Sequence, residues 1–226
     1  MICDREHWQA HGNMLHSVKT GETAFDYTFG QPIFPYYAQN PAPAEVFDNA
    51  MTDFSKSIAN AVVATYNFSG AETIADIAGG HGLLLATVLK ANPNAKGILF
   101  DQPQVIAGAG NVLEREGVAE RVETVSGDFF SSIPVEADIY LMKFIIHDWN
   151  DEQAVEILQN LAKSAAKGAT VLLVESVVED DDSVPSMSKV MDLNMLAMTG
   201  GKERTEKEYA ALFEKTGFKL TRVIQT

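Results

Sequence analysis

The sequence is poor in cysteine and in basic residues. Cys3 is the only cysteine among 226 residues, which excludes an intramolecular disulfide and a cysteine-based zinc site. Lysine and arginine number 17 against 31 aspartates and glutamates, so the formal net charge is −14. Because phosphate binding requires clustered basic side chains, and no such cluster occurs, this composition argues against nucleic acid as a partner.

Long apolar runs are also missing. No stretch reaches the roughly 18 to 20 apolar residues of a membrane helix, and the N-terminus has no hydrophobic core of a signal peptide. Aliphatic and aromatic content is ordinary, and the length allows one well-buried core with a small appendage. We therefore expect a globular, cytoplasmic protein without a membrane span.

The most informative stretch that is present runs from Thr73 to Gly82. A β-branched strand ends near an acid, Asp76, and is followed by a glycine-rich turn and a helix that opens at Leu83. This arrangement brings the backbone of α/β proteins close to a nucleotide-like ligand. Taken alone the signal is weak, because Gly-Gly-x-Gly after a strand is often only a tight turn.

Later strands strengthen the prediction of a nucleotide-like ligand at this turn. Lys96 to Asp101 is an apolar strand that ends in a carboxylate, where doubly wound folds place the acid for ribose hydroxyls. Arg121 to Ser126 leads into another acid and an aromatic pair, and Asp138 to Lys143 leads into Phe144-Ile145-Ile146-His147-Asp148-Trp149. Polar groups thus gather at one edge of a mostly parallel sheet, and we predict an α/β, doubly wound, Rossmann-like fold.

The rest of the chain divides into two parts. Residues 1–43 are rich in aromatics and poor in periodicity, and we expect a helical or irregular arm lying against residues 44–226, the predicted catalytic domain. Apolar spacing predicts a long helix from Ala44 to Tyr66. Further expected helices are Leu83–Ala91, Gln104–Glu116, Asp151–Lys167, Ser186–Met198 and one from a capping box at Thr205 to Gly217. The remaining expected strands are Thr170–Val178, buried on both faces, and Phe218–Ile224.

Six motifs together identify a family resemblance. They are Asp-Ile-Ala-Gly-Gly-His-Gly, Phe-Asp-Gln-Pro, Gly-Asp-Phe-Phe, His-Asp-Trp, Val-Glu-Ser and Gly-Gly-Lys-Glu-Arg-Thr. Through their order and spacing, residues 12–226 resemble the S-adenosylmethionine-dependent O-methyltransferases that act on small hydroxylated molecules. Within that family the chain resembles the bacterial branch, which is similar to plant phenolic, acetylserotonin and hydroxyneurosporene O-methyltransferases. The resemblance implies S-adenosylmethionine as cofactor and methyl transfer to the hydroxyl of a small aromatic or polyketide-like acceptor.

It also implies a role for individual residues. His147 matches the general base, and Glu175 and Glu203 match the acids beside it. The implied cofactor site comprises Ser55, Asp76, Ala78, Gly79, Gly80, Gly82, Asp101 at the ribose, Gln102, Asp128 and Phe129 at the adenine, and Lys143. The implied acceptor pocket comprises Phe47, Met51, Asp148, Asn194, Met195 and Met198. No metal site is predicted.

These residue types suit methyl transfer. A sulfonium methyl is already activated, so an enzyme must mainly hold an oxygen in line with it and remove a proton. A histidine with a pKa of about 6.5 deprotonates a phenol with a pKa of about 10 only when proton removal is coupled to transfer, and two carboxylates stabilise the resulting imidazolium. Methionine and phenylalanine supply an adaptable apolar pocket.

Structural explanations compete with each assignment. Without the family motifs, a histidine before Asp-Trp is more often a cap or packing group, and Met195 and Met198 at helical spacing are more often core. Lys143 could extend its amine to solvent from the strand end. Glu175 is harder to explain structurally, because a buried carboxylate without a partner is costly.

The sequence also departs from the family pattern. Ala78 replaces a glycine and Gln102 replaces an apolar residue, and both bear on cofactor affinity. Family members carry an N-terminal dimerisation domain and a further, seventh strand, and this chain resembles a catalytic domain that lacks most of the first and all of the second. The aromatic arm then predicts self-association, with a homodimer as the expected form.

Two other functions stay open at this point. The chain could be a catalytically impaired cofactor-binding fragment or an interaction module, although the complete set His147, Glu175 and Glu203 favours an enzyme. A dinucleotide dehydrogenase is a weaker alternative, because its fingerprint, Gly-x-Gly-x-x-Gly, has a different spacing.

Overall fold

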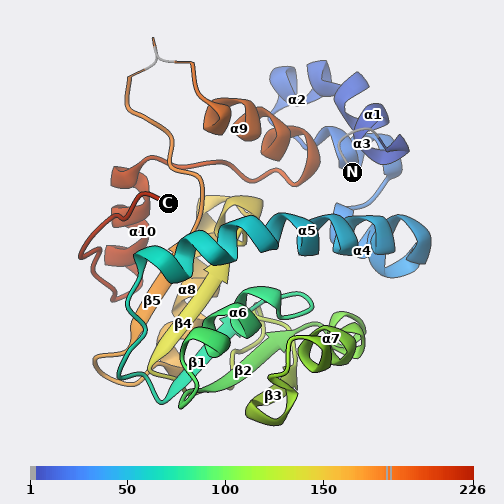
Figure 1. Cartoon of the computed structure of the whole chain (residues 1–226). Helices are drawn as coiled ribbons and strands as arrows, with labels where there is room; N and C mark the ends of the chain where they lie inside the picture. The colour runs from blue at the N-terminus through green and yellow to red at the C-terminus, as the bar shows by residue number, and fades with distance from the viewer. Residues whose placement is uncertain (1–3, 182, 184) are drawn as a thin grey trace.

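Five parallel strands form the centre of the chain in the computed structural model, which describes residues 4–181, 183 and 185–226 (Figure 1). Cys3 and Asp182 lie outside these residues. The strand order is β3-β2-β1-β4-β5. β2 and β3 are added on one side of β1, and the chain then crosses back to add β4 and β5 on the other side. The strands are β1 (Thr73–Ile77), β2 (Lys96–Asp101), β3 (Val122–Ser126), β4 (Ile139–Lys143) and β5 (Thr170–Val174).

Helices cover both faces of this sheet, as a doubly wound fold requires. One face packs against α5, α6 and α7, and the other packs against α8 and α10. Their bounds are α5 (Pro41–Thr65), α6 (Leu83–Ala91), α7 (Pro103–Arg115), α8 (Asp151–Ser164), α9 (Met187–Met198) and α10 (Glu206–Lys215), with 3-10 turns at η1 (Ala119–Arg121) and η2 (Ile146–Asp148). The predicted fold class is therefore confirmed.

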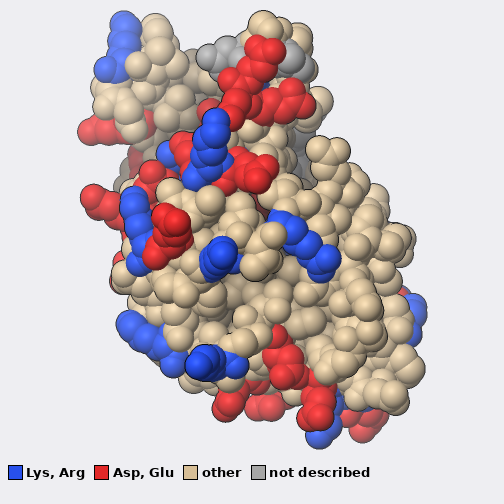
Figure 2. All heavy atoms as spheres, turned by 90° about the vertical axis from the view of Figure 1, so that its left-hand side faces the viewer, with Lys and Arg blue, Asp and Glu red and all other residues tan. Residues whose placement is uncertain are grey.

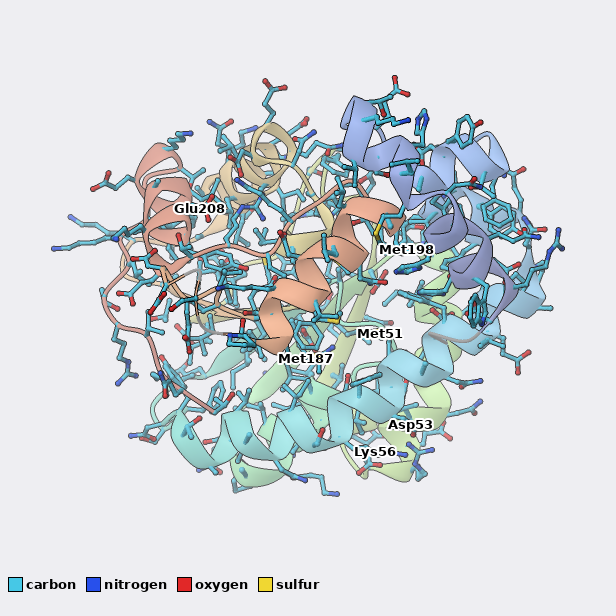
Figure 3. The ribbon with its side chains drawn as sticks, turned by 90° about the horizontal axis from the view of Figure 1, so that it is seen from above. Met51, Asp53, Lys56, Met187, Met198 and Glu208 are labelled. Atoms are coloured by element: carbon cyan, nitrogen blue, oxygen red, sulfur yellow. The ribbon has the colours of Figure 1, made fainter. Side chains whose placement is uncertain are left out.

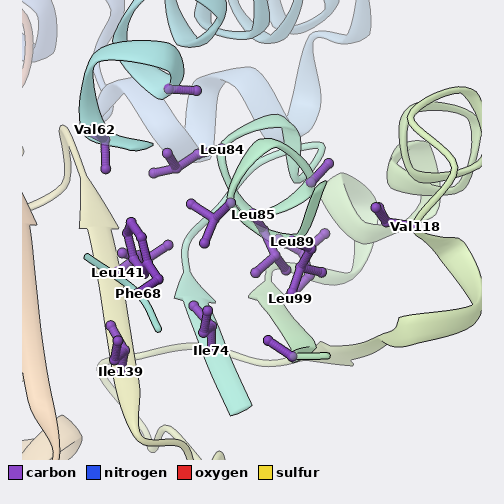
Figure 4. Close-up of a cluster of buried hydrophobic side chains, with 14 of the residues drawn as sticks. Val62, Phe68, Ile74, Leu84, Leu85, Leu89, Leu99, Val118, Ile139 and Leu141 are labelled. Atoms are coloured by element: carbon purple, nitrogen blue, oxygen red, sulfur yellow. The ribbon is translucent and has the colours of Figure 1, made fainter. Parts of the chain in front are cut away.

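Alternation along the strands explains the two cores. Successive side chains of a strand point to opposite faces, so Ile74 joins the core beneath α5 and α6 while Ala75 joins the core beneath α8. Figure 4 shows the first core, where Leu85 and Leu89 of α6 pack over Ile74 and Leu99. Because both faces are buried, these strands hold the turns at their carboxyl ends in place.

The N-terminal arm is helical. Its four short helices are α1 (Arg5–Gly12), α2 (Met14–Thr20), α3 (Ala24–Phe29) and α4 (Ile33–Gln39). Phe25 and Tyr37 of the arm form a small core with Met198, at the end of α9. Some of the arm's aromatic side chains thus pack against α9, whereas Trp8 and Tyr27 are exposed, and α5 follows the arm directly (Figure 1).

Two strand predictions are wrong. Phe218–Ile224 is not a strand, although Phe218 and Leu220 still pack against the core beneath α8. A strand needs a partner for its backbone, and none of the described strands pairs with this segment, which borders a cavity beside β5. β5 itself ends at Val174 instead of Val178 and is only half-buried, because it lies at the edge of the sheet.

Charged side chains of both signs lie at the surface (Figure 2). On the face shown in Figure 2, acidic and basic side chains are interspersed. None of the described helices combines the length and the apolar character that crossing a membrane requires.

Candidate active site

The glycine turn between β1 and α6 brings bare backbone to the carboxyl edge of the sheet. A Cβ atom on Gly79 would lie 2.6 Å from both Asp76 Cγ and Leu99 Cδ1, so only glycine fits there. The chain then passes Gly80 and Gly82 with φ of 62° and 80°, a conformation that costs glycine little. Ala78 adopts a φ of 55°, which glycine would adopt more easily, so this departure from the family pattern places strain beside the turn.

Asp101 fastens this turn to the end of β2. Its carboxylate accepts hydrogen bonds from the backbone N–H of Gly80 at 2.8 Å and of Gln102 at 2.7 Å. Burial raises the pKa of Asp101 to about 6, while the two N–H donors oppose that rise. A fixed acceptor therefore lies next to the glycine turn.

Asp76 and Lys143 lie on the neighbouring strands β1 and β4 and interact electrostatically. Asp76 is buried, and neither of its carboxylate oxygens has a hydrogen-bond partner among the described residues. Burial raises its pKa to about 7, and Lys143 opposes the rise. Burial lowers the pKa of Lys143, whose ammonium lies 4.8 Å from the ring centre of Phe144. Unpaired buried oxygens of this kind are suited to a polar ligand.

One cavity brings most of the predicted cofactor and acceptor residues together. Of the predicted cofactor set, its walls contain Ser55, Asp76, Ala78, Gly79, Gly80, Asp101, Gln102, Phe129 and Lys143. Of the predicted acceptor set, they contain Phe47, Met51 and Asp148. The cavity therefore lies between the carboxyl edge of the sheet and the long helix α5.

His147, Glu175 and Glu203 meet in a buried cluster next to that cavity. His147 Nδ1 lies 2.9 Å from Glu203 Oε1 and 3.6 Å from Glu175 Oε2, and His147 Nε2 lies 3.8 Å from Asp148 Oδ1. Glu175 Oε1 also accepts hydrogen bonds from Ile145 N and Ile146 N. His147 does not itself line the cavity, whereas its neighbour Asp148 does.

The cluster favours a charged imidazole. Burial by itself lowers the pKa of His147, but Glu175, Glu203 and Asp148 together raise it to about 9. Burial raises the pKa of Glu175 to about 7 and that of Asp148 to about 6, so protons are shared within the cluster.

Phe144 supports the histidine through an uncommon backbone conformation. Its φ is 56°, which is sterically costly for a bulky residue and must be enforced by its surroundings. Its ring stacks on the imidazole of His147 at 5.3 Å with an interplanar angle of 14°. The turn after β4 is therefore held in a strained shape that presents a flat ring to the imidazole.

Several predicted site residues lie elsewhere. Gly82 packs against Leu99, and Asp128 caps its own turn by accepting a hydrogen bond from Phe130 N at 2.9 Å. Three predicted acceptor residues on α9, namely Asn194, Met195 and Met198, also lie outside the cavity walls. The two methionines are buried, and Figure 3 places Met198 at the end of α9 nearest the N-terminal helices.

Other lining residues were missed from the sequence. On α5, Asp48 and Thr52 face the cavity, and Thr52 Oγ1 lies 3.3 Å from His81 Nδ1 in the glycine turn. Their spacing of four residues, and of three from Thr52 to Ser55, puts all three on one helix face, which could have revealed them. Phe34, Tyr37 and Trp149 complete an aromatic wall that the sequence pattern did not indicate.

The lining fits a ligand with positive charge and a polar, nucleoside-like part. Four carboxylates face the cavity against one ammonium: Asp48, Asp76, Asp101, Asp148 and Lys143. S-adenosylmethionine carries a sulfonium and an ammonium beside one carboxylate, and its ribose offers two donors to an acid such as Asp101. The uncovered backbone at Gly79 provides the close approach that such a ligand needs.

The buried acids predict an uncommon pH dependence of stability. Asp76 and Asp101 have folded-state pKa values of about 7 and about 6, above the ordinary value of 3.8 for an aspartate, because both carboxyls are buried. From about pH 4 upward the unfolded chain releases protons that the folded chain retains, so this contribution to stability is lost as the pH rises towards 7. In thermal unfolding scans without ligand, we expect Tm to increase by several degrees from pH 8 to about pH 5.5. Asp76→Asn should flatten the trend, and a Tm that falls on this acidification would contradict the burial of these charges.

The chain is similar to known proteins over most of its length. A family model described as the O-methyltransferase domain matches residues 9–219. The chain is 42% identical over 221 residues to a phenazine O-methyltransferase of Lysobacter antibioticus, covering 98% of this chain and 64% of that protein. It is 39% identical to a mitomycin biosynthesis 6-O-methyltransferase of Streptomyces lavendulae, covering 96% of this chain and 61% of that protein. The chain thus spans about three fifths of the length of these relatives.

Solved structures agree. The crystal structure of LaPhzM superposes with a TM-score of 0.95 at 41% identity, covering 98% of this chain and 67% of that one. An O-methyltransferase from neocarzinostatin biosynthesis, in complex with S-adenosylmethionine and 2-hydroxy-5-methyl naphthoic acid, superposes with a TM-score of 0.86 at 28% identity, covering 94% of this chain and 63% of that one.

Proposed function

The chain belongs to the family of S-adenosylmethionine-dependent O-methyltransferases, and from this membership we propose that it methylates a hydroxyl group of a small aromatic molecule. The single observation that best supports the proposal is the cavity itself. It joins the glycine turn and Asp101 to an aromatic wall, and it adjoins the His147 cluster.

We propose that the cofactor lies along the carboxyl edge of the sheet. Asp101 would accept the ribose hydroxyls, and the backbone at Gly79 would approach the methionine part, with Asp76 and Lys143 beside it. Phe129 offers an aromatic face to the adenine, whereas Asp128 would have to leave its turn to reach it. When bound, S-adenosylmethionine supplies the activated methyl group.

His147 is the proposed general base. Its Nδ1 is occupied by Glu203 at 2.9 Å, so Nε2, which faces Asp148, is the nitrogen free to take the acceptor proton. The pKa of His147, about 9, is close to the value of about 10 for a phenol. Proton transfer from a phenol to His147 therefore has only a small free-energy cost. Glu175 and Glu203 would then stabilise the imidazolium.

The base assignment predicts a pH–rate profile. Because His147 is mostly protonated at neutral pH, only a small fraction of the chain starts in the competent state. We expect kcat/KM for a weakly acidic phenol to rise about tenfold per pH unit and to level off near pH 9. His147→Gln should remove this rise, and a profile that is flat from pH 6 to about 9 in the parent would exclude His147 as the base.

Relatives and lining suggest the acceptor class. The related proteins are named for phenazine, mitomycin and 3-amino-4-hydroxybenzoate substrates. In this chain the aromatic rings of Phe34 and Trp149 lie 5.6 Å apart beside the cavity, and those of Tyr37 and Phe47 lie 5.1 Å apart. These rings would favour a flat, fused aromatic acceptor.

We further propose a homodimer and a cytoplasmic location, which solution scattering and cell fractionation test.

The test is a screen with a deuterated methyl donor. The chain is incubated with S-adenosylmethionine labelled at the methyl group and a panel of hydroxylated fused aromatics, and products are analysed by mass spectrometry. Labelled methyl on an acceptor oxygen is the expected result. Cofactor binding without transfer to any acceptor would favour the alternative, a catalytically impaired cofactor-binding module.

A further inference from the structure

We propose that Arg204 is a positioning residue that holds the His147 turn in its productive geometry, an inference that rests on the proposed function of that turn. Arg204 lies three residues after Gly201 in the loop that also carries Glu203, and its side chain is buried without measurable exposure. It does not touch the cavity.

The guanidinium binds two carbonyls of the turn and the carboxylate at the start of α8. It donates to the carbonyl oxygen of Ile146 at 2.9 Å, to that of Trp149 at 2.7 Å, and through two nitrogens to Asp151 Oδ1 at 3.0 and 2.9 Å. The two carbonyls flank His147 and Asp148 in the chain. A planar fork with several donors can hold such a set, because its hydrogen bonds are fixed relative to one another.

Gly201 brings the two segments into direct contact. A Cβ atom at this position would lie 2.0 Å from the carbonyl oxygen of His147 and 2.4 Å from the carbonyl carbon of Asp148. The loop that supplies Glu203 therefore lies against the turn that supplies His147. Arg204 joins the same two segments, so it maintains the 2.9 Å contact between Glu203 and His147.

The turn needs such support because it is strained. Phe144 has a φ of 56°, and a bulky residue keeps this conformation only where its surroundings enforce it. On one side Glu175 binds the N–H groups of Ile145 and Ile146. On the other side Arg204 binds the carbonyl of Ile146, so the turn is held from both directions.

The chain offers a matched control. Arg121 also donates to three backbone carbonyls, those of Leu89, Asn92 and Ala95, at 2.9, 3.2 and 2.7 Å. It joins the end of α6 to β3, away from the cavity. Arg204→Lys and Arg121→Lys each keep the positive charge and lose the planar guanidinium with its several donors. A difference between the two variants therefore comes from where the arginine lies in the fold.

The experiment is an NMR titration of the His147 imidazole in both variants, assigned by loss of its signal in His147→Gln. Glu175, Glu203 and Asp148 are the charged groups that raise the pKa of His147. If Arg204→Lys loosens the turn, we expect the pKa of His147 to fall by one unit or more, whereas Arg121→Lys leaves it unchanged. Because Arg204→Lys keeps the positive charge, a downward shift reports a looser contact between His147 and its carboxylates and not a change in charge.

Activity provides a second, separate readout. We expect at least a tenfold fall in kcat for Arg204→Lys, with cofactor affinity within twofold of the parent. Equal pKa values in the two variants, with similar losses in Tm, would reduce Arg204 to a structural role. If Arg204→Lys does not fold, Asp151→Glu, which keeps the negative charge and displaces the carboxylate from the guanidinium, decides by the same criterion with a smaller downward shift. An inactive parent would contradict the proposed function, while the NMR shift would still decide the role of Arg204.

Discussion

Replacing His147 with alanine is expected to reduce methyl transfer by about a hundredfold or more, while S-adenosylmethionine binds almost as tightly as before. Nε2 of the imidazole points towards the cavity-lining Asp148 at 3.8 Å, while Nδ1 is held by Glu203, and the bordering carboxylates maintain the basicity of the ring. Because its ring is absent from the cavity walls, its removal should spare the cofactor contacts. Single-turnover rates and calorimetric titration measure the two effects separately.

A remote histidine provides the control for that result. His16, on α2, is bound to Glu22 at 3.1 Å and lies outside the cavity walls, so His16→Ala should keep the parent rate. An acceptor that is not already ionised must be used, because an ionised acceptor does not need a base. Equal rates in the parent and in His147→Ala under these conditions would exclude His147 as the base.

Replacing Asp101 with alanine should weaken cofactor binding by about 1.5 to 3 kcal/mol, or roughly ten- to a hundredfold. The variant loses the charged acceptor for the ribose and the anchor that holds the backbone of Gly80. Calorimetric titration with S-adenosylhomocysteine, which cannot react, gives the affinity directly.

Asp138 is a closely matched control for Asp101. Its carboxylate also accepts from two backbone N–H groups, those of Glu72 at 2.8 Å and Thr73 at 2.9 Å, but at the opposite edge of the sheet. Asp138→Ala should therefore lower stability without changing affinity. Similar affinities for the two variants would show that Asp101 acts only on the fold.

The central part of the fold was predictable because its signals are local. The strand, acid and glycine turn from Thr73 to Gly82 follow one another in the chain, and their conformations follow from residue types over a few positions. The capping box at Thr205 is local too and is present, with Glu208 binding back to Thr205 N. Alternation of strands and helices then determined the parallel sheet.

The C-terminal prediction failed because a strand is not a local structure. The apolar pattern of residues 218–224 suits a strand, but its formation depends on a neighbouring backbone that sequence periodicity cannot reveal. The half-buried edge strand β5 was misjudged for the same reason. Apolar composition predicted its strand character and not its place in the sheet.

The site was predictable only in part. His147, Glu175 and Glu203 come from three distant segments, and their convergence followed from the family resemblance rather than from spacing. The support of that cluster was not visible at all. The left-handed conformation of Phe144 and the carbonyl contacts of Arg204 depend on tertiary packing, which overrides the preference of either residue alone.

A crystal structure of this chain with S-adenosylhomocysteine tests the central claim most directly. The account predicts ribose hydroxyls within about 3 Å of the Asp101 carboxylate, the methionine part along the backbone of Gly79, and the sulfur directed towards the side of the cavity that Asp148 lines next to His147. A nucleoside bound elsewhere, or one whose sulfur faces away from Asp148 and His147, would contradict it.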